Sequence, residues 1–425
     1  MNHRFAKYVC FVFCVAGMLP RDAGAQTPAE VPAKRLQLIP CTNLYPILSA
    51  RMREEGTTVL SATLQTDGTV RDVAVASSSG KPRLDEASIQ CISAWAYAPP
   101  LKNGTPFEVP INPSVVWKLT SNDGFGEQIE QLSEKLKINQ DAATLVQRGN
   151  AYRASGKPEL ALADFKIALA LTPNDPAIYL AIAGLQAALK DPAARQSYDQ
   201  AVAADPFNVT ALKARADYLI AGSSFEEARR DYDAMLAVYP ANRPLLLWRG
   251  DLLVKLQQTA AAHQDYANLL QGGQSDSWTV KGLQSRANLL HRQLQFAAAI
   301  KDLDRILLIQ PSANAFNASC RERALANLQL EQAATYCAQA LRLSSNAPLA
   351  LATQGLVEFR AERYSEAAAT FGRVLKVDPK MAGALFMRGV SKKRVGRSEG
   401  DEDIAGAIKL DAHVVDEYGL YGIKP

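Results

Sequence analysis

The chain has few of the residues that usually build a catalytic or metal site. Only four histidines occur among 425 residues. His3 lies at the N-terminus, and His263, His291 and His413 are far apart, so no two have the spacing of metal ligands or of a catalytic triad. We therefore predict no catalytic site, no metal site and no cofactor, and a protein that is not an enzyme.

The sequence also lacks a large excess of charge of either sign. The net charge is +4, and the 47 lysines and arginines are scattered rather than grouped in blocks. This balance gives no electrostatic basis for binding nucleic acid. A loop with Gly80-Lys81 follows an alternating apolar run, as in a phosphate-binding loop, but Val75 stands where the first glycine of that motif belongs and Pro82 follows the lysine. We therefore predict no nucleotide site.

A long apolar run is missing as well. Arg4 and Lys7 precede twelve apolar or small residues, and Ala23-Gly24-Ala25 follows. This order is typical of a secretory signal peptide, here 1–25, cut before Gln26. Twelve residues are fewer than the roughly 20 that span a bilayer. The alternative is that the segment stays uncleaved as a membrane anchor.

The sequence has few cysteines, and export decides which of them remain and whether they can form disulfides. Cys10 and Cys14 leave with the signal peptide, so Cys41, Cys91, Cys320 and Cys337 remain. In an oxidising compartment four cysteines allow three different pairings.

What the sequence does have is an internal repeat of about 34 residues. Its most regular position is alanine, with successive spacings of 33, 34, 34, 37, 34 and 34 residues. These alanines are Ala161, Ala194, Ala228, Ala262, Ala299, Ala333 and Ala367. A larger side chain follows four residues later, and in five repeats a small residue lies twelve residues earlier. Small residues on two antiparallel helices let their backbones approach, and the larger side chain fills the seam between them.

The pattern resembles the tetratricopeptide repeat. That resemblance implies an all-α solenoid with seven repeats over 142–381. We expect 382–425 to be an eighth, capping repeat with a C-terminal tail, because Asp401 stands in its alanine position and a solenoid needs a polar outer helix at an open end. The segment 121–141 carries a helical stripe of Ile129, Leu132 and Leu136, which predicts a linker helix that docks on the first repeat.

Four repeats share an arginine just before the small residue and an aspartate sixteen residues later. The pairs are Arg148 and Asp164, Arg215 and Asp231, Arg249 and Asp265, and Arg286 and Asp302. Repeats two and seven, with Ile182 and Gln354 near the arginine position, lack the aspartate too. Because the two residues occur together, we predict structural ion pairs that join the two helices of a repeat. The alternative is a ladder of charged ligands.

The sixth repeat favours one cysteine pairing. Cys337 occupies the large position of its second helix, and Cys320 lies close to the small position of its first. These positions face each other, so we predict a Cys320–Cys337 disulfide worth about 3 kcal/mol in the entropic model. The alternative is two reduced, buried cysteines.

The residues before the repeats predict a different fold. The runs 57–66 and 69–78 alternate like half-buried strands around the turn Asp67-Gly68, 84–97 has helical spacing, and 107–119 reads like a last strand. A small α+β domain at 41–120 follows, joined to the signal peptide by a linker at 26–40.

This domain resembles the C-terminal domain of TonB, the periplasmic energy transducer. The shared points are Tyr45-Pro46, Glu55-Gly56, Asp67-Gly68, Ser78-Ser79-Gly80, Leu84-Asp85, Trp95-x-Tyr97-x-Pro99 and Gly104. The resemblance implies a three-stranded antiparallel sheet with two helices, in a periplasmic protein of a Gram-negative cell. In that family a sheet edge binds an extended receptor peptide by strand addition.

The chain departs from that family in two ways. A signal peptide and a short linker replace the usual anchor and proline-rich spacer, and Pro110 and Pro113 interrupt the last strand. Because proline removes a backbone donor, strand addition is confined to Ser114, Val115, Val116, Trp117 and Lys118, or is lost. With the other two cysteines paired, Cys41 and Cys91 are the natural partners in this domain.

The first helices of the repeats should form a curved surface for a protein or peptide. Its candidate binding residues are Asn150, Arg153, Lys213, Asp217, Asp251, Asn288 and His291. We therefore expect a non-catalytic periplasmic adaptor or scaffold with partners in the cell envelope. The alternative is a TonB-type transducer for transport across the outer membrane, which requires a retained anchor in the inner membrane.

Overall fold

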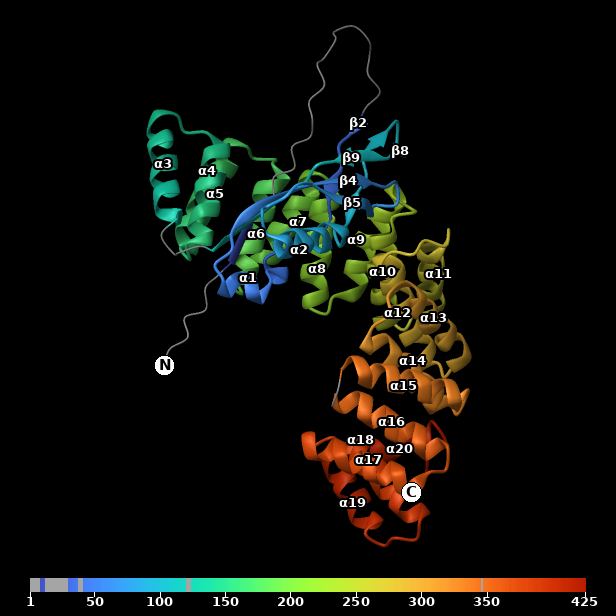
Figure 1. Ribbon diagram of the computed structural model, residues 1–425. Coiled ribbons are helices and arrows are strands. Elements are labelled where there is room, and N and C mark those ends of the chain that lie inside the picture. The colour runs from blue at the N-terminus through green and yellow to red at the C-terminus, as the bar shows by residue number, and fades with distance from the viewer. Residues whose placement is uncertain (1–7, 12–29, 37–40, 120–123, 345–346) are drawn as a thin grey trace. The chain divides into compact units, whose positions relative to one another are not determined.

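A computed structural model describes residues 8–11, 30–36, 41–119, 124–344 and 347–425 (Figure 1). These residues form two compact parts, Met1–Leu269 and Leu270–Pro425, and each is described by itself. The signal peptide predicted at 1–25 and the linker at 26–40 lie mostly outside the described residues.

The N-terminal domain is built on an antiparallel sheet. β4 (Gly56–Leu64) and β5 (Val70–Ser77) form the predicted hairpin, and β10 (Ser114–Leu119) pairs with the other side of β4. Gly68 has a φ of 80° in the hairpin turn, a conformation that favours glycine. The three-stranded sheet expected from the sequence is therefore present.

Two further strands extend this sheet. The predicted last strand is split by Asn112-Pro113 into β9 (Val109–Ile111) and β10, and both pair with β4. β1 (Tyr8–Phe11) pairs antiparallel with the outer edge of β10. The order is thus β1-β10-β4-β5, with β9 also on β4.

Short strands make two smaller sheets beside it. One contains β2 (Glu30–Val31), β7 (Leu101–Lys102) and β8 (Thr105–Pro106), and the other β3 (Lys34–Arg35) and β6 (Tyr97–Ala98).

One face of the main sheet is covered by helices. The chain enters through the 3₁₀ turn η1 (Cys41–Leu44) and α1 (Ile47–Arg51), and α2 (Pro82–Ser93) follows β5. Leu84, Ile92 and Trp95 are fully buried in the same core as Trp117. The helical spacing expected through residue 97 was wrong at its end, because α2 stops at Ser93 and Tyr97 is in β6. The prolines at 99 and 100 disfavour helix just before them.

The described residues after β10 are mainly helical. The elements are α3 (Gly124–Ile138), α4 (Ala142–Ala154), α5 (Pro158–Leu171), α6 (Pro176–Ala188), α7 (Ala194–Ala204), α8 (Val209–Ala221), α9 (Phe225–Val238), α10 (Arg243–Lys255), α11 (Thr259–Leu270), α12 (Ser277–Arg292), α13 (Phe296–Ile309), α14 (Ala313–Ala326), α15 (Leu330–Leu343), α16 (Pro348–Arg360), α17 (Tyr364–Val377), α18 (Ala382–Arg394), α19 (Gly400–Leu410) and α20 (Val414–Gly419). Hairpins of consecutive helices, beginning with α4 and α5, form eight repeats, and α20 follows the last. This is the all-α solenoid expected from the sequence.

Close helix contact explains the small residues of the repeat. A Cβ on Gly149 of α4 would lie 2.5 Å from the Phe165 ring of α5, and one on Gly250 of α10 would lie 2.7 Å from the Tyr266 ring of α11. The partner alanines, among them Ala161 and Ala262, are fully buried. The linker helix α3 packs on repeat 1, where Leu136 joins the core of Leu145 and Phe165.

The last repeat has a different register from the expected one. Gly400, rather than Asp401, lies against Gly389 of the first helix, since a Cβ on Gly389 would come within 2.7 Å of the Gly400 carbonyl oxygen. The prediction that Asp401 occupies the alanine position was therefore wrong by one residue. Gly389 and Gly400 are eleven residues apart, whereas the facing small residues of repeats 1 and 4 are twelve apart, and this shift also hid an ion pair described below.

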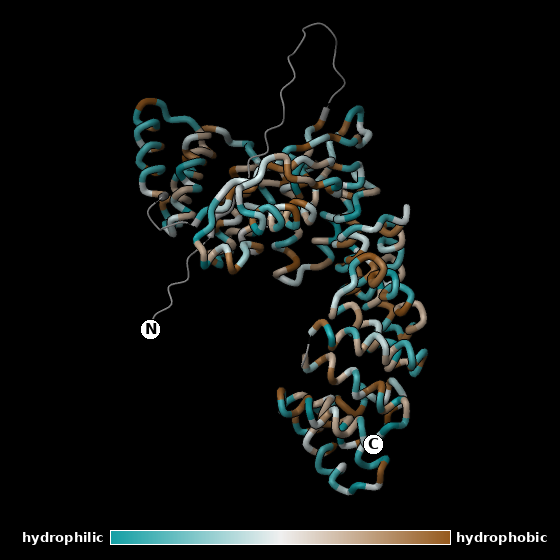
Figure 2. Tube along the Cα trace, in the orientation of Figure 1, coloured by the Kyte–Doolittle hydropathy of each residue, from teal (hydrophilic) through white to brown (hydrophobic). Residues whose placement is uncertain are grey.

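Hydrophobic and hydrophilic residues are mixed along the helices of the array (Figure 2). Among the described residues, no helix combines the length and the apolarity needed to cross a membrane.

Candidate interaction surfaces

The predicted strand-addition edge is the outer side of β10. Ser114–Trp117 pair with Val59–Gly56 of β4, and Leu119–Val116 pair on the other side with Tyr8–Phe11 of β1. Val115 and Trp117 point into the core, and Trp117 Nε1 donates to Ser88 Oγ at 2.9 Å. The edge thus accepts a four-residue antiparallel strand, and here that strand comes from the segment predicted to be a signal peptide.

The Gly80-Lys81 loop is organised around Asp85. This carboxylate accepts hydrogen bonds from Thr58 Oγ1 at 2.8 Å, from the Ser79 amide at 2.9 Å and from the Ser78 hydroxyl. Burial raises the pKa of Asp85, but these hydrogen bonds outweigh it and the net pKa is lowered. The Asp85 carboxylate therefore accepts the hydrogen bonds that this loop would need to donate to a phosphate.

The hairpin turn of the N-terminal domain contacts repeat 4, within the same compact part. Asn242 Nδ2 donates to the Tyr97 carbonyl at 2.6 Å, and the Arg243 amide donates to the Asp67 carbonyl at 2.9 Å. Arg243 Nη1 also lies 3.5 Å from Asp67 Oδ2. Asn242 and Arg243 are almost fully buried. The domain is thus held on the array by polar contacts with the start of α10.

The candidate binding residues of the first part differ in their access to solvent. Arg153, Asp217 and Asp251 are exposed and Asn150 is half-buried. Lys213 is only 5% exposed, and its Nζ lies 2.6 Å from Asp217 and 4.4 Å from the centre of the Trp248 ring. Lys213 is therefore already engaged within the chain.

In the second part His291 lies at a cavity, while Asn288 is exposed and accepts from Gln284. His291 Nδ1 is 2.8 Å from Glu322 Oε2, and its Nε2 is 3.3 Å from the Tyr421 hydroxyl. The cavity measures about 340 Å³ and is lined by first helices of repeats 5 to 8 together with α20 and Tyr421. Burial raises the pKa of Tyr421. The C-terminal segment thus forms one wall of this inner surface.

All four predicted ion pairs are present, and each is bidentate. The terminal nitrogen of each arginine lies 2.6 to 2.7 Å from its aspartate, in Arg148–Asp164, Arg215–Asp231, Arg249–Asp265 and Arg286–Asp302. Two arginines also reach the preceding repeat: Arg215 contacts Asp199 at 3.1 Å and Arg249 contacts Asp233 at 2.9 Å. The pairs therefore join neighbouring repeats as well as the helices of one repeat.

A fifth pair of this kind was missed. Arg388 Nη2 lies 2.6 Å from Asp403 Oδ1, with a spacing of fifteen residues instead of sixteen. The eleven-residue spacing of Gly389 and Gly400, one residue less than in repeats 1 and 4, accounts for the difference, and aligning these two glycines would have found the pair.

Both predicted disulfides are supported by the structure. Cys41 in η1 is bonded to Cys91 in α2, with their Cα atoms 5.5 Å apart, and Cys320 in α14 is bonded to Cys337 in α15, with their Cα atoms 5.6 Å apart. The first joins the entering chain to α2, and the second joins the two helices of repeat 6.

No group of three or more histidine, cysteine, aspartate or glutamate side chains in the described ranges has the arrangement of a metal site. Sequence reasoning also missed the contact of Asn242 with Tyr97 and the buried Glu358, because neither follows a local spacing.

Family models match both modules of the chain. Residues 42–119 match the Gram-negative bacterial TonB protein C-terminal family, and residues 146–209, 192–243 and 352–391 match the tetratricopeptide repeat family. Both are folds of protein–protein interaction. No curated protein matches the chain.

Several solved structures are similar to parts of the chain. A tetratricopeptide repeat protein from Parabacteroides merdae is 18% identical with a TM-score of 0.42, over 64% of this chain and 99% of that one. PilF of Pseudomonas aeruginosa is 20% identical with a TM-score of 0.38, over 52% of this chain and 97% of that one. Yeast Tom70 is 16% identical with a TM-score of 0.37, over 68% of this chain and 62% of that one.

Proposed function

We propose that this chain, a TonB C-terminal domain joined to a tetratricopeptide array, is a non-catalytic adaptor of the Gram-negative periplasm. The array binds a protein partner, and the TonB-like domain contacts a component of the cell envelope. The two disulfides support this location, since such bonds persist in oxidising compartments.

The cavity beside His291 is the observation that carries the proposal. It lies on first helices of successive repeats, which form the surface that solenoids use for binding, and its wall combines apolar Leu356 with polar Asn317 and Arg321. A mixed wall of this kind suits a peptide segment better than a small apolar ligand.

Site-specific photo-crosslinking in the periplasm tests this function. A photoreactive amino acid at Ala352, on the cavity wall, should capture a defined partner, and the same group at Gln332, exposed on α15, should not. The capture should fall when Arg321 is changed to Glu. Equal capture from positions 352 and 332 would contradict the proposal.

A second candidate function is energy transduction to an outer-membrane receptor. The pairing of β1 with β10 favours it, because this edge accepts an antiparallel strand. It requires that the N-terminal segment stays in the inner membrane, which takes Tyr8–Phe11 off this edge and leaves the edge free for a receptor peptide. N-terminal sequencing of the periplasmic protein separates the two functions: Gln26 as the first residue excludes the transducer, and a retained Met1 supports it.

A further inference from the structure

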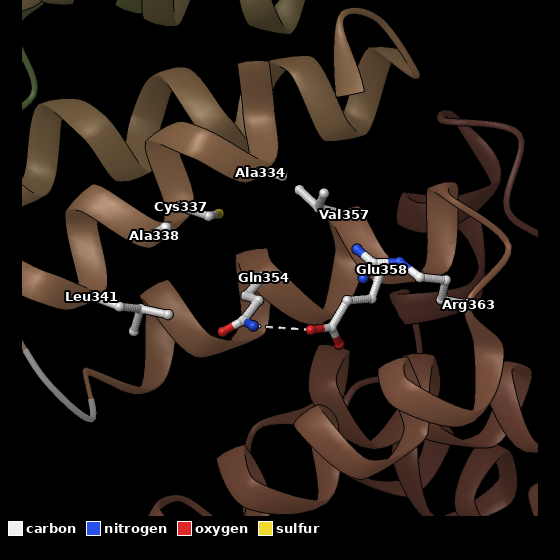
Figure 3. A pocket seen from close by; sticks show the side chains of 8 residues that line it. All are labelled: Ala334, Cys337, Ala338, Leu341, Gln354, Val357, Glu358 and Arg363. Carbon is white, nitrogen blue, oxygen red and sulfur yellow. Dashed lines mark hydrogen bonds between the residues drawn. The ribbon is translucent and has the colours of Figure 1, made fainter. Parts of the chain in front are cut away.

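A second hollow lies between repeats 6 and 7, on the other side of α16 from the His291 cavity. Its volume is about 250 Å³. Figure 3 shows the side chains that line it. Ala334 and Ala338 of α15 are exposed at its rim, whereas Cys337 and Glu358 are buried. The helix α16 supplies Gln354, Val357 and Glu358 to this hollow, while its residues Leu349, Thr353 and Leu356 line the other cavity.

The buried carboxylate of Glu358 has one unused oxygen. Glu358 is only 6% exposed, and its Oε1 accepts a hydrogen bond from Gln354 Nε2 at 2.9 Å. Within the described part of the chain, Oε2 is buried and accepts no hydrogen bond. A buried carboxylate oxygen without a donor is unfavourable, so this site favours a group that donates to it.

The repeat pattern explains why space remains beside Glu358. In repeats 3 and 4, Arg215 and Arg249 fill the corresponding place and reach Asp199 and Asp233 of the preceding second helix. In repeat 7 the arginine is replaced by Gln354. The residue five positions after the repeat alanine, aspartate in repeats 2 and 3, is Ala338 in repeat 6. Two shorter side chains therefore leave a hollow where a guanidinium lies elsewhere.

The one basic residue that lines the hollow is engaged at the surface. Arg363 is half-exposed, and its Nη1 lies 3.0 Å from Glu366 Oε2. Because Arg363 pairs with Glu366, the charge of the Glu358 carboxylate is left for a cation that enters past the exposed Ala338.

We propose that this hollow binds a basic side chain, arginine or lysine, of a protein partner. The cation pairs with the Glu358 carboxylate and replaces the guanidinium that the repeat pattern lacks here. This inference assigns a basic side chain to the partner, and it therefore rests on the proposed adaptor function. The hollow can nevertheless be tested alone.

Methyl NMR of the full chain, titrated with N-acetyl-arginine methylamide, tests the site. The methyl signals of Ala334, Ala338 and Val357 should shift with a millimolar Kd. The matched neutral probe, N-acetyl-citrulline methylamide, should bind at least about tenfold more weakly, because it lacks the charge. Equal affinity for the two probes, or no shift with the arginine probe, would overturn the inference.

Three variants complete the test. Glu358→Gln should weaken the arginine probe by about tenfold or more, whereas Glu362→Gln, the same charge change at an exposed position nearby, should leave it unchanged. Gln354→Arg should restore the repeat arginine, raise the Tm and abolish the shifts. This variant keeps the inference falsifiable if Glu358→Gln fails to fold, since an unchanged titration with it would contradict the site.

The two proposals fail separately in these experiments. Probe binding without a captured partner would support the basic-group site and contradict the adaptor function. Capture at position 352 without probe binding would support the adaptor function and contradict the basic-group site.

Discussion

At the scale of single residues, Asp85 shows how a loop that resembles a ligand site can serve the fold. Its carboxylate binds the hydroxyl of Thr58 in β4 and the backbone of Ser79, so it ties the start of α2 to the hairpin. Without this carboxylate, the hydrogen-bond donors of the loop would be free to bind a ligand.

Asp85→Asn should lower the free energy of unfolding by about 1–3 kcal/mol at pH 7, because hydrogen bonds to a charged group are lost. The pKa of Asp85 is lowered in the folded chain. Its contribution is therefore fully present above the unfolded pKa of about 3.9 and is lost as the pH falls through the folded value. Denaturant unfolding at pH 7 and at pH 3 measures this.

The difference between the wild type and Asp85→Asn should thus shrink in acid. Glu86→Gln, an exposed neighbour on α2, is the control and should change the unfolding free energy little at either pH. A difference that grew in acid would contradict this role of Asp85.

Gly149 is a second residue whose role the packing defines. Gly149→Ala should destabilise the chain by about 1–3 kcal/mol, because the new methyl group meets the Phe165 ring at 2.5 Å. Gly184→Ala, also inside a helix but with no atom within 4 Å of its Cβ apart from the backbone of its own helix, should stabilise it by up to about 1 kcal/mol. Thermal unfolding of both variants checks the contrast, and similar shifts would contradict it.

At the scale of elements, the arginines of the repeats join helices. Arg249 lies between α9 and α11, with Asp265 almost fully buried and Asp233 partly exposed. Hydrogen bonding to Asp265 raises the pKa of Arg249, even though burial opposes it. Such a pair stabilises the register of neighbouring repeats.

Arg249→Met should cost about 2–4 kcal/mol, because Asp265 would keep a buried charge without its partner. Arg195→Met breaks a pair in which all members are about 40% or more exposed and should cost less than about 1 kcal/mol. Adding Asp265→Leu to Arg249→Met should recover most of the loss. Urea unfolding of the three variants measures these differences, and no recovery would contradict the assignment.

At the scale of the whole molecule, the N-terminal domain is a docked module within its compact part. Asn242 both caps α10, by accepting from the Leu245 amide at 3.1 Å, and donates to the Tyr97 carbonyl. The turn at Gly68 leaves no room for a side chain, since a Cβ there would lie 2.2 Å from Asn242 Nδ2.

Asn242→Asp separates these two roles. The carboxylate keeps the cap, but it removes the donor to Tyr97 and places a negative charge against the Tyr97 carbonyl oxygen, so the docking contact should weaken by about 1–3 kcal/mol. Hydrogen exchange at Tyr97 and Thr69 should become faster. Ser312→Asp, a cap of α14 in the other compact part, should leave exchange in the N-terminal domain unchanged.

The sequence by itself determined the features that depend on local spacing. The buried alanines, the arginine–aspartate pairs sixteen residues apart and Cys320–Cys337 all follow from two helices of constant length joined by a constant turn. A spacing between Gly389 and Gly400 that is one residue shorter than in the other repeats was enough to hide the Arg388–Asp403 pair.

Tertiary structure decided the rest, because these features join residues far apart in the chain. The pairing of β1 with β10, the contact of Asn242 with Tyr97 and the C-terminal wall beside His291 have no periodic pattern that predicts them. The hollow at Glu358 exists because Gln354 and Ala338, on different helices, are both short. Only their packing together leaves a hollow beside a buried carboxylate that has one oxygen without a donor.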